Sequence, residues 1–430
     1  MLFMALSVGP TVGQDLGSLR QQKPFKLSGS GSIMANGYQA INMADRRQPF
    51  SWAISASPTV TIYGVSFPFQ VFISSQTRQL GTPFSRYGAS PTYKWAKVHL
   101  GWRSLSFGQF TLGGQQILGG GFELTPGQLR VGFMYGTFLK GISGADLQQA
   151  GERDSSYVTQ LRPQFSRRGL AAKIGYGSAA TYLEANYLQA QDKRGYLSDT
   201  LANRFQLAPA FNQVLGLNGR VDIGPFFLQA EAAVRHYVRD IRADTLTLSE
   251  VFEPNPLLKL LTNARASSQI TTALNASAGY QHTNFGLALT YRRIDPDFKS
   301  MGIYFIQSDI EQLTVAPNLT LFTGKLSLNG SFGVQRDNLG HTNLNNSNRT
   351  IGSLNVSINP IPAFGLDVQF ANFGITQNRN TGYVFQQSVN KPQILDSLRV
   401  QQVSNSFTVI PRFTHQRPAA LHMITLMGSY

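Results

Sequence analysis

The chain has 430 residues, carries a net charge of +15 and contains no cysteine, and only 14% of its residues are charged. That charged fraction lies well below the roughly 25% of soluble domains, and the missing cysteines exclude a disulfide framework and thiolate chemistry. The mean hydropathy of -0.13, with no apolar run of about 18 residues past the first few positions, excludes a protein that crosses a membrane with helices.

The first 25 residues are expected to lie outside the folded domain. Residues 1–14 (MLFMALSVGPTVGQ) have an apolar centre and small residues near their end, as in a shortened secretory signal peptide, and residues 15–25 are interpreted as a linker. A disordered tail is the alternative for residues 1–14, because the basic start of a signal peptide is missing. Residues 26–430 are expected to form a single domain.

Strand patterns begin at residue 26 and continue to the end of the chain. Residues 26–39, 50–57 and 65–75 alternate between apolar and polar side chains, and Pro58 is expected to end the second of these strands. Further strands are predicted at 93–102, 115–124, 128–140, 169–177, 181–191, 213–224, 226–238, 268–281, 285–294, 310–321, 325–335, 351–359, 364–376, 403–413 and 420–430.

The clearest pair of strands lies at 310–321 and 325–335, on either side of a turn at 322–324. Side chains alternate between the two faces of a strand, so each member of the pair has one apolar and one polar face. Soluble strands usually have about 5 to 6 residues. These two have about 10 each, which matches the roughly 9 to 11 residues that cross a bilayer at a tilt.

The connections between predicted strands alternate between short turns and long loops. An up-and-down meander produces this alternation when one rim bears the turns and the other bears the loops, as in transmembrane barrels. The sequence therefore predicts an all-β fold, a transmembrane antiparallel up-and-down β-barrel of roughly 16 to 20 strands with short periplasmic turns and long extracellular loops. The long loops are expected at 141–168, 192–212, 239–267, 295–308, 336–350 and 377–402.

Charged residues occupy the polar phase of several predicted strands, and in a barrel this phase faces the lumen. A basic excess there would favour anionic solutes, whereas charges that merely pair with one another would give no selectivity. Both interpretations stay open at this stage. The residues predicted to line the lumen are Arg220, Asp222, Glu231, Arg235, Arg292 and Lys325.

Catalytic and ligand-binding patterns are missing from the sequence. The six histidines have no metal-ligand spacing and HExxH is absent, so neither a metal nor a cofactor is expected. Ser155 and Ser156 lie beside Asp154 and Glu152, but adjacent residues are not a catalytic triad, and no enzymatic activity is expected. Lysine and arginine are scattered without an aromatic and basic platform, so no nucleic-acid partner is expected.

Two stretches carry a family resemblance. They are residues 86–114 (RYGASPTYKWAKVHLGWRSLSFGQFTLGG) and residues 291–309 (YRRIDPDFKSMGIYFIQSD), the latter continuing to QRDN at 335–338. They resemble segments of uncharacterised outer-membrane β-barrel proteins of the Bacteroidota. The resemblance implies a barrel in the outer membrane of a Gram-negative bacterium over most of the chain beyond residue 25, and it brings no catalytic motif.

The predicted function is porin-like passage of small solutes, within outer-membrane lipid and in an oligomeric state that the sequence leaves open. The alternative is a structural or assembly barrel whose long loops dock a secretion or surface-attachment protein. A loop folded into the lumen would favour a plugged or gated state. Loops 141–168 and 239–267 are the predicted candidates, the second because Leu257, Leu258 and Leu260 make it apolar.

The end of the chain has two interpretations. Ile424, Leu426, Gly428 and Tyr430 are in phase, and a terminal aromatic residue resembles the assembly signal of a complete outer-membrane barrel. A cut within a longer barrel would leave the same end.

Overall fold

The computed structural model describes residues 25–39, 50–62, 65–74, 86–153, 162–245, 264–340, 345–379, 400–417 and 420–429. The predicted signal peptide, nearly all of the predicted linker and the apolar stretch around Leu257, Leu258 and Leu260 lie outside these ranges. No helix within the described ranges is both long and apolar enough to span a membrane.

Most of the described chain is β-strand, as the alternating pattern predicted. The strands pair antiparallel with their neighbours, and β15 pairs in parallel with β7. The described loops also contain the helices α1 (Gly144–Arg153) and α3 (Asp199–Arg204). The sheet consists of β1 (Phe25–Gly37), β2 (Phe50–Ile62), β3 (Val65–Ser74), β4 (Arg86–Ala89), β5 (Thr92–Tyr93), β6 (Ala96–Ser106), β7 (Leu112–Leu124), β8 (Leu129–Leu139), β9 (Arg167–Gly177), β10 (Tyr182–Asp192), β11 (Phe211–Ile223), β12 (Phe226–Val238), β13 (Ser268–Gln281), β14 (Phe285–Ile294), β15 (Gly302–Ile303), β16 (Ile310–Leu321), β17 (Leu326–Asp337), β18 (Asn345–Ile361), β19 (Phe364–Arg379), β20 (Val400–Arg417), β21 (Ala420–Thr425) and β22 (Gly428–Ser429).

The strands follow one another around the sheet in chain order. β4 and β5 share one place between β3 and β6, and β21 and β22 share one place beside β20. β15 belongs to a segment that lies inside the fold. The 22 strands therefore fill 19 positions of the meander, which falls within the predicted roughly 16 to 20.

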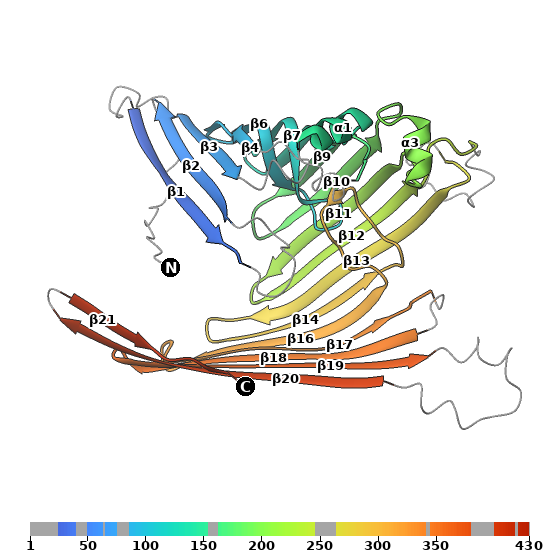
Figure 1. Ribbon diagram of the computed structural model, residues 1–430. Coiled ribbons are helices and arrows are strands. Elements are labelled where there is room, and N and C mark those ends of the chain that lie inside the picture. The colour runs from blue at the N-terminus through green and yellow to red at the C-terminus, as the bar shows by residue number, and fades with distance from the viewer. Residues whose placement is uncertain are drawn as a thin grey trace, which may run out of the picture.

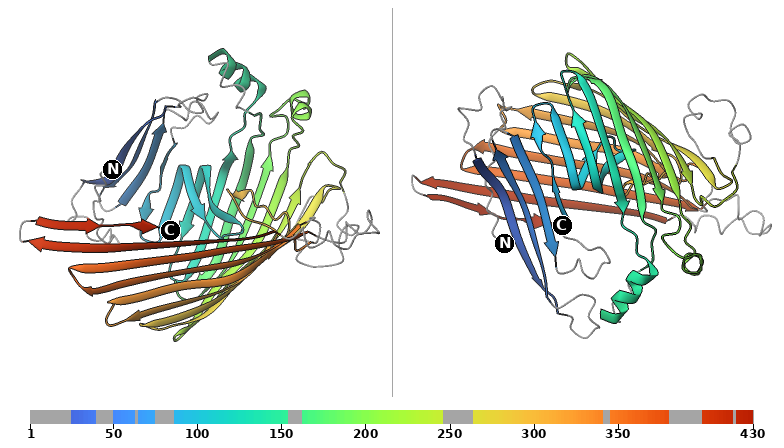
Figure 2. Two further views of the ribbon diagram at one scale, coloured as in Figure 1. Left: turned by 60° about the horizontal axis from the view of Figure 1, so that its bottom comes forward. Right: turned by 90° about the horizontal axis from the view of Figure 1, so that it is seen from above.

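The sheet curls around a central space, with β1 to β3 at one end and β20 to β22 at the other (Figures 1 and 2). Among the described residues no pairing joins β1 to β20, β21 or β22. The helices α1 and α3 lie at the rim that bears long loops, opposite the tight turns. The antiparallel up-and-down barrel fold is thus confirmed.

The outer face of the sheet is apolar and exposed. On β11, Leu217 is 51% exposed and Val221 is 42% exposed, while the polar residues between them face inward. Near the short turns the rings of Phe226 and Tyr280 lie 5.2 Å apart, and the ring of Phe285 lies 6.2 Å from that of Tyr280. An exposed apolar band bordered by aromatic rings is the pattern of a barrel wall in contact with lipid.

Two expectations about strand ends are corrected by the structure. Pro58 does not end β2, which continues to Ile62. Proline has no N–H to donate to a ladder, and the β2–β3 ladder skips it, passing from the pair Ala56–Val71 to the pair Thr59–Pro68. The expected long loop at 336–350 is also shorter, because β17 reaches Asp337 and β18 begins at Asn345.

A hydrophobic core lies on the inner face, over β6 to β16. Inward side chains in register on neighbouring strands are apolar here, since Ala233 lies opposite Ala273 and Ala273 lies opposite Ile294. They pack against Phe110 and Phe298, which belong to connecting segments folded into the central space. The buried core comprises Leu105, Phe107, Phe110, Leu112, Ile117, Met134, Phe138, Ala171, Leu188, Val214, Ala233, Ala273, Ile294, Phe298 and Ile310.

Candidate functional site

The inner face is polar between this core and the short turns. Residues two apart in a strand share a face, and residues in register on neighbouring strands lie side by side. One polar residue from each of eight strands therefore joins a continuous row, which we call the polar row. It comprises Glu184, Asn218, Glu231, Asn275, Arg292, Gln312, Gln335 and Arg349.

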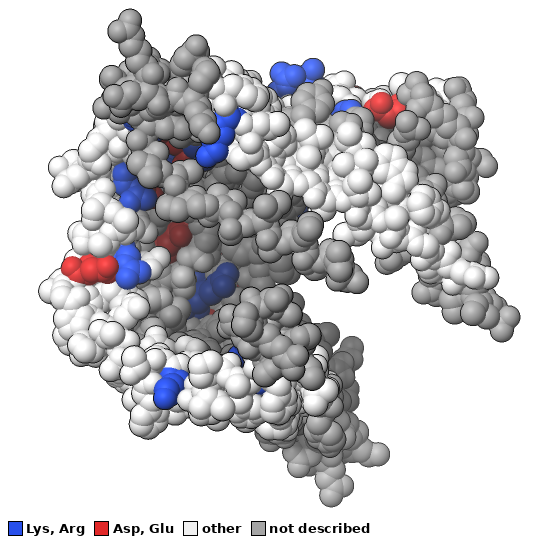
Figure 3. Space-filling model, turned by 90° about the vertical axis from the view of Figure 1, so that its left-hand side faces the viewer, with Lys and Arg blue, Asp and Glu red and all other residues white. Residues whose placement is uncertain are grey.

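Charged side chains lie in the hollow of the molecule as well as on its outer surface. Figure 3 shows basic and acidic atoms within the hollow between the two ends of the sheet and others along the outer edge of the molecule. The outward charges of β14, β16 and β17 lie at the strand ends next to the long loops, away from the middle of the wall, where burying an ion in hydrocarbon would cost several kcal/mol. They are Arg293, Glu311 and Arg336.

An ion pair and hydrogen bonds hold the two carboxylates of the polar row. Arg130 Nε lies 2.5 Å from Glu184 Oε1, and Asn218 donates from Nδ2 to Glu184 Oε2 at 3.3 Å. The Glu231 carboxylate accepts a hydrogen bond from the backbone N–H of Phe110 at 3.0 Å. Both acidic groups are therefore already engaged within the protein.

Arginine dominates the other half of the polar row. Arg292 is half-buried, and its Nε has no hydrogen-bond partner in the described part of the chain. It lies opposite Gln312 of β16, and Arg349 of β18 lies opposite Gln335 of β17. With Glu184 and Glu231 engaged elsewhere, this half of the inner wall presents positive charge to the central space.

Five of the six residues predicted to line the lumen lie on the inner face, in the strands and phase that the sequence indicated. Arg220 and Asp222 pair with each other, with 2.8 Å between Nε and Oδ1, and Arg292 belongs to the polar row. Lys325 does not lie on the inner face of a strand, because it is exposed in the turn between β16 and β17.

The other two residues, Glu231 and Arg235, hold connecting segments inside the barrel. Both lie on β12 and face inward. Glu231 binds the turn between β6 and β7, and fully buried Arg235 donates from Nη1 to the backbone carbonyl of Asp297, in the segment between β14 and β16. Their charges serve at least partly to anchor internal structure.

These two connecting segments, residues 107–111 and 295–309, form what we call the inner insert. They are joined by a hydrogen bond from Ser300 Oγ to the Thr111 carbonyl at 2.7 Å and by the parallel pairing of β15 with β7. Asn212 of β11 accepts a hydrogen bond from the Met301 N–H at 2.9 Å. The inner insert thus occupies the space beside β7 to β14 and narrows any passage there.

The inner insert differs from the loops expected to fold inward. The sequence predicts only a long loop between β14 and β16, and it does not predict that the turn between β6 and β7 folds inward. Loop 141–168 instead forms α1, and its Phe165 packs with Leu197 and Ala202 of the next loop. The available signal was the presence of apolar side chains such as Phe298 and Met301 within a connecting segment, which a water-exposed loop would not favour.

A chain of hydrogen bonds links a buried serine and a buried histidine to a half-buried glutamate. Ser90 Oγ lies 2.9 Å from His99 Nδ1, and His99 Nε2 lies 2.9 Å from Glu123 Oε1. Ser90 is completely buried, so no substrate can reach its hydroxyl. The arrangement fixes the residues after β4 against β6 and β7. In the described ranges no group of three or more histidines, aspartates or glutamates could hold a metal ion.

Comparisons with known proteins yield structural likeness only. No protein-family model and no curated protein matches the sequence. Among solved structures, Pseudomonas aeruginosa OccK11 (OpdR) is 11% identical with a TM-score of 0.42, covering 94% of this chain and 96% of that one. OccK2 (OpdF) in complex with glucuronate, from the same organism, is 10% identical with a TM-score of 0.43, covering 90% of this chain and 97% of that one. The outer membrane protein OprD from Pseudomonas aeruginosa is 12% identical with a TM-score of 0.40, covering 90% of this chain and 92% of that one. TM-scores this low support no argument about function.

Proposed function

We propose that this protein is an outer-membrane β-barrel that lets small solutes pass along its polar inner wall, with a preference for anions. The observation that carries the proposal is the polar row, whose two acidic residues are engaged by Arg130 and Phe110, while the half-buried Arg292 forms no ion pair with any carboxylate of the described residues. A wall of this kind hydrates solutes and attracts negative charge.

Three further observations support the proposal. The apolar outer face fits a position in a membrane. The resemblance of residues 86–114 and 291–309 to barrel proteins of the Bacteroidota favours the outer membrane of a Gram-negative bacterium. The inner insert leaves the passage selective rather than wide, because it occupies the side of β7 to β14.

The test is conductance of the refolded full-length chain in a planar bilayer, with the reversal potential measured under a salt gradient. We expect stable conductance steps and a reversal potential that indicates anion preference. Insertion without conductance would contradict the proposal and would direct attention to a protein partner at the long loops.

Neighbouring arginines on β14 provide a matched pair of variants for this measurement. Arg292 faces inward and Arg293 faces outward, so Arg292→Gln and Arg293→Gln each remove one positive charge at the same height from opposite faces of one strand. We expect Arg292→Gln to move the reversal potential toward cation preference and Arg293→Gln to leave it unchanged. Equal shifts in both variants would show that selectivity arises elsewhere.

A further inference from the structure

A pocket of about 400 Å³ lies on the wall formed by β8, β9 and β10, where these strands meet the rim of long loops. We call it the rim pocket. Its strand residues Tyr135, Leu170 and Gln189 are in register with one another on the outer face. The lining consists of Tyr135, Arg168, Gly169, Leu170, Gln189, Ala190, Gln191, Asp192, Lys193 and Arg194.

The rim pocket is continuous with the apolar band of the outer wall. Ile174 follows Leu170 on the outer face of β9, and Ile174 and Leu183 are among the most exposed apolar residues of this wall. Arg168 lies on the same face two residues from Leu170 toward the long loops. Toward the long loops, the outer surface changes from apolar at Leu170 to basic at Arg168, two residues away on the same strand, so a molecule bound there contacts both environments.

Positive charge dominates the rim pocket. Its single carboxylate, that of Asp192, is bound by Arg167, with 2.8 Å between Nε and Oδ1, and by the Ala210 N–H at 3.1 Å. No carboxylate lies within salt-bridge distance of Arg168 or Lys193 among the residues that the structure describes. Both cations are therefore available to an anion from outside the protein.

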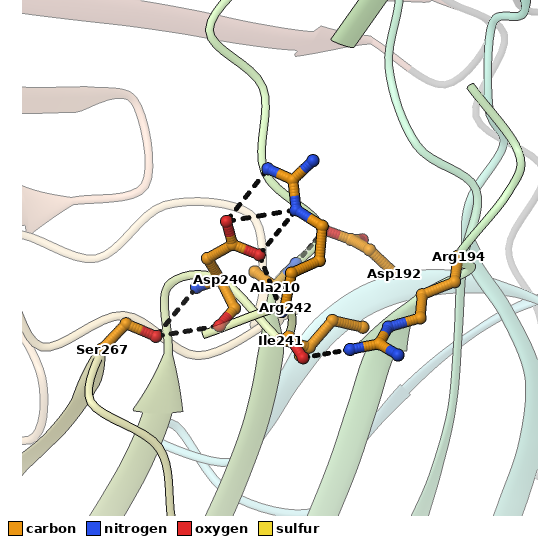
Figure 4. Close-up of polar contacts among 7 residues, drawn as sticks. All are labelled: Asp192, Arg194, Ala210, Asp240, Ile241, Arg242 and Ser267. Carbon is orange, nitrogen blue, oxygen red and sulfur yellow. Dashed lines mark hydrogen bonds and ion pairs between the residues drawn. The ribbon is translucent and has the colours of Figure 1, made fainter. Parts of the chain in front are cut away.

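The shape of the rim pocket is fixed by contacts between loops. Arg194 reaches from the β10–β11 loop and donates from Nη2 to the Ile241 carbonyl in the β12–β13 loop (Figure 4). That loop is held in turn, since Asp240 binds Arg242 through both carboxylate oxygens and accepts at its backbone carbonyl from Ser267 Oγ at 2.9 Å. The loop that carries Lys193 and Arg194 is thus held in place by its contact with the β12–β13 loop.

We propose that the rim pocket binds the phosphorylated headgroup of a glycolipid in the outer leaflet of the membrane. Phosphate oxygens would be bound by Arg168 and Lys193, and acyl chains would lie along Leu170 and Ile174. The inference rests on the proposed membrane orientation, in which the long loops face outward. Basic pockets next to an apolar wall are the usual means of binding anionic lipid headgroups, and arginine matches the geometry of phosphate.

The test is lipid retention by the full-length protein in nanodiscs of zwitterionic phospholipid with no net charge, titrated with diphosphoryl lipid A and analysed by native mass spectrometry. We expect saturable binding that weakens by about 30-fold in the double variant Arg168→Gln, Lys193→Gln, because two basic contacts are lost. The control Arg293→Gln, Arg336→Gln removes two outward cations at another part of the wall and should bind as the unaltered protein does. Equal affinity in both double variants would overturn the proposal.

Two further arms identify the source of the phosphate. Inorganic phosphate at millimolar concentration should not displace lipid A, and monophosphoryl lipid A should bind more weakly than the diphosphoryl form. Binding of inorganic phosphate with no retention of lipid A would also overturn the proposal. Conductance is recorded separately for each variant, so a barrel that binds lipid without conducting ions would refute only the proposed solute passage.

Discussion

The two halves of the sheet have the same alternating sequence pattern but differ in what covers their inner face. Over β6 to β16 the inner insert buries inward side chains in a hydrophobic core. At the beginning of the sheet, every residue of β1 is exposed on both faces. The difference teaches that alternation assigns a side chain to a face, whereas burial on that face depends on which distant segment folds against it.

The largest expected effect concerns the aromatic side chains of the inner insert. Phe298 and Phe305 belong to the same segment, but Phe298 is 1% exposed and Phe305 is 83% exposed. Phe298→Ala should lower the free energy of unfolding by about 3 to 5 kcal/mol, because it leaves a cavity in a packed core. The measurement is denaturant unfolding of the protein in lipid vesicles.

The matched control is Phe305→Ala, which should change the free energy of unfolding by less than about 0.5 kcal/mol, as substitutions outside packed regions usually do. Similar losses in both variants would mean that the filled half of the sheet is not stabilised by its insert, and the comparison between the two halves would fail.

A smaller effect is expected where the wall binds the insert through a carboxylate. Glu231→Ala leaves the Phe110 N–H without its acceptor, and a buried unpaired donor costs about 1 to 3 kcal/mol. We therefore expect faster hydrogen exchange over residues 107–112, measured by mass spectrometry. Asp222→Ala removes another inward carboxylate that pairs with Arg220, and it should leave exchange in this turn unchanged.

The smallest effect concerns pH at the rim. Hydrogen bonds from the Arg242 side chain hold the pKa of Asp240 below its ordinary value. Because the folded-state pKa is lowered, the interaction contributes stability above the ordinary aspartate pKa of about 3.9 and loses it as the pH falls through the lowered value. After division by the intrinsic exchange rate at each pH, the protection of residues 240–245 against hydrogen exchange should therefore fall at acid pH. Asp240→Asn should abolish that dependence, and a dependence that persists would assign it to another group.

Much of the wall could be predicted because strand alternation is a local property. The pairing of β16 with β17 and the inward phase of Arg220, Glu231 and Arg292 follow from a repeat of two residues and a tight turn. The predicted strand ends were less accurate. At Pro58 the β2–β3 ladder is interrupted, while the β1–β2 ladder continues through it. A single sequence pattern does not distinguish those two ladders.

The rim pocket and the inner insert could not be predicted in the same way. Arg168 and Lys193 are separated by a whole hairpin, and their common position depends on the β9–β10 register and on the loop contact that Arg194 makes with Ile241. Arg235 had the correct face, but its bond to the Asp297 carbonyl depends on where the loop after β14 lies. Neither arrangement has a fixed spacing in the sequence.

The sequence by itself determined an all-β chain of long alternating strands, an apolar outer face and a polar inner face, because each of these depends on residues two apart. Only the tertiary structure decided which connecting segments fill the barrel. Ser300 binds the carbonyl of Thr111, which lies 189 residues earlier in the chain. Such a contact requires the curled sheet that brings distant segments together, so the physical cause of the filled half lies in the assembled sheet and not in any local pattern.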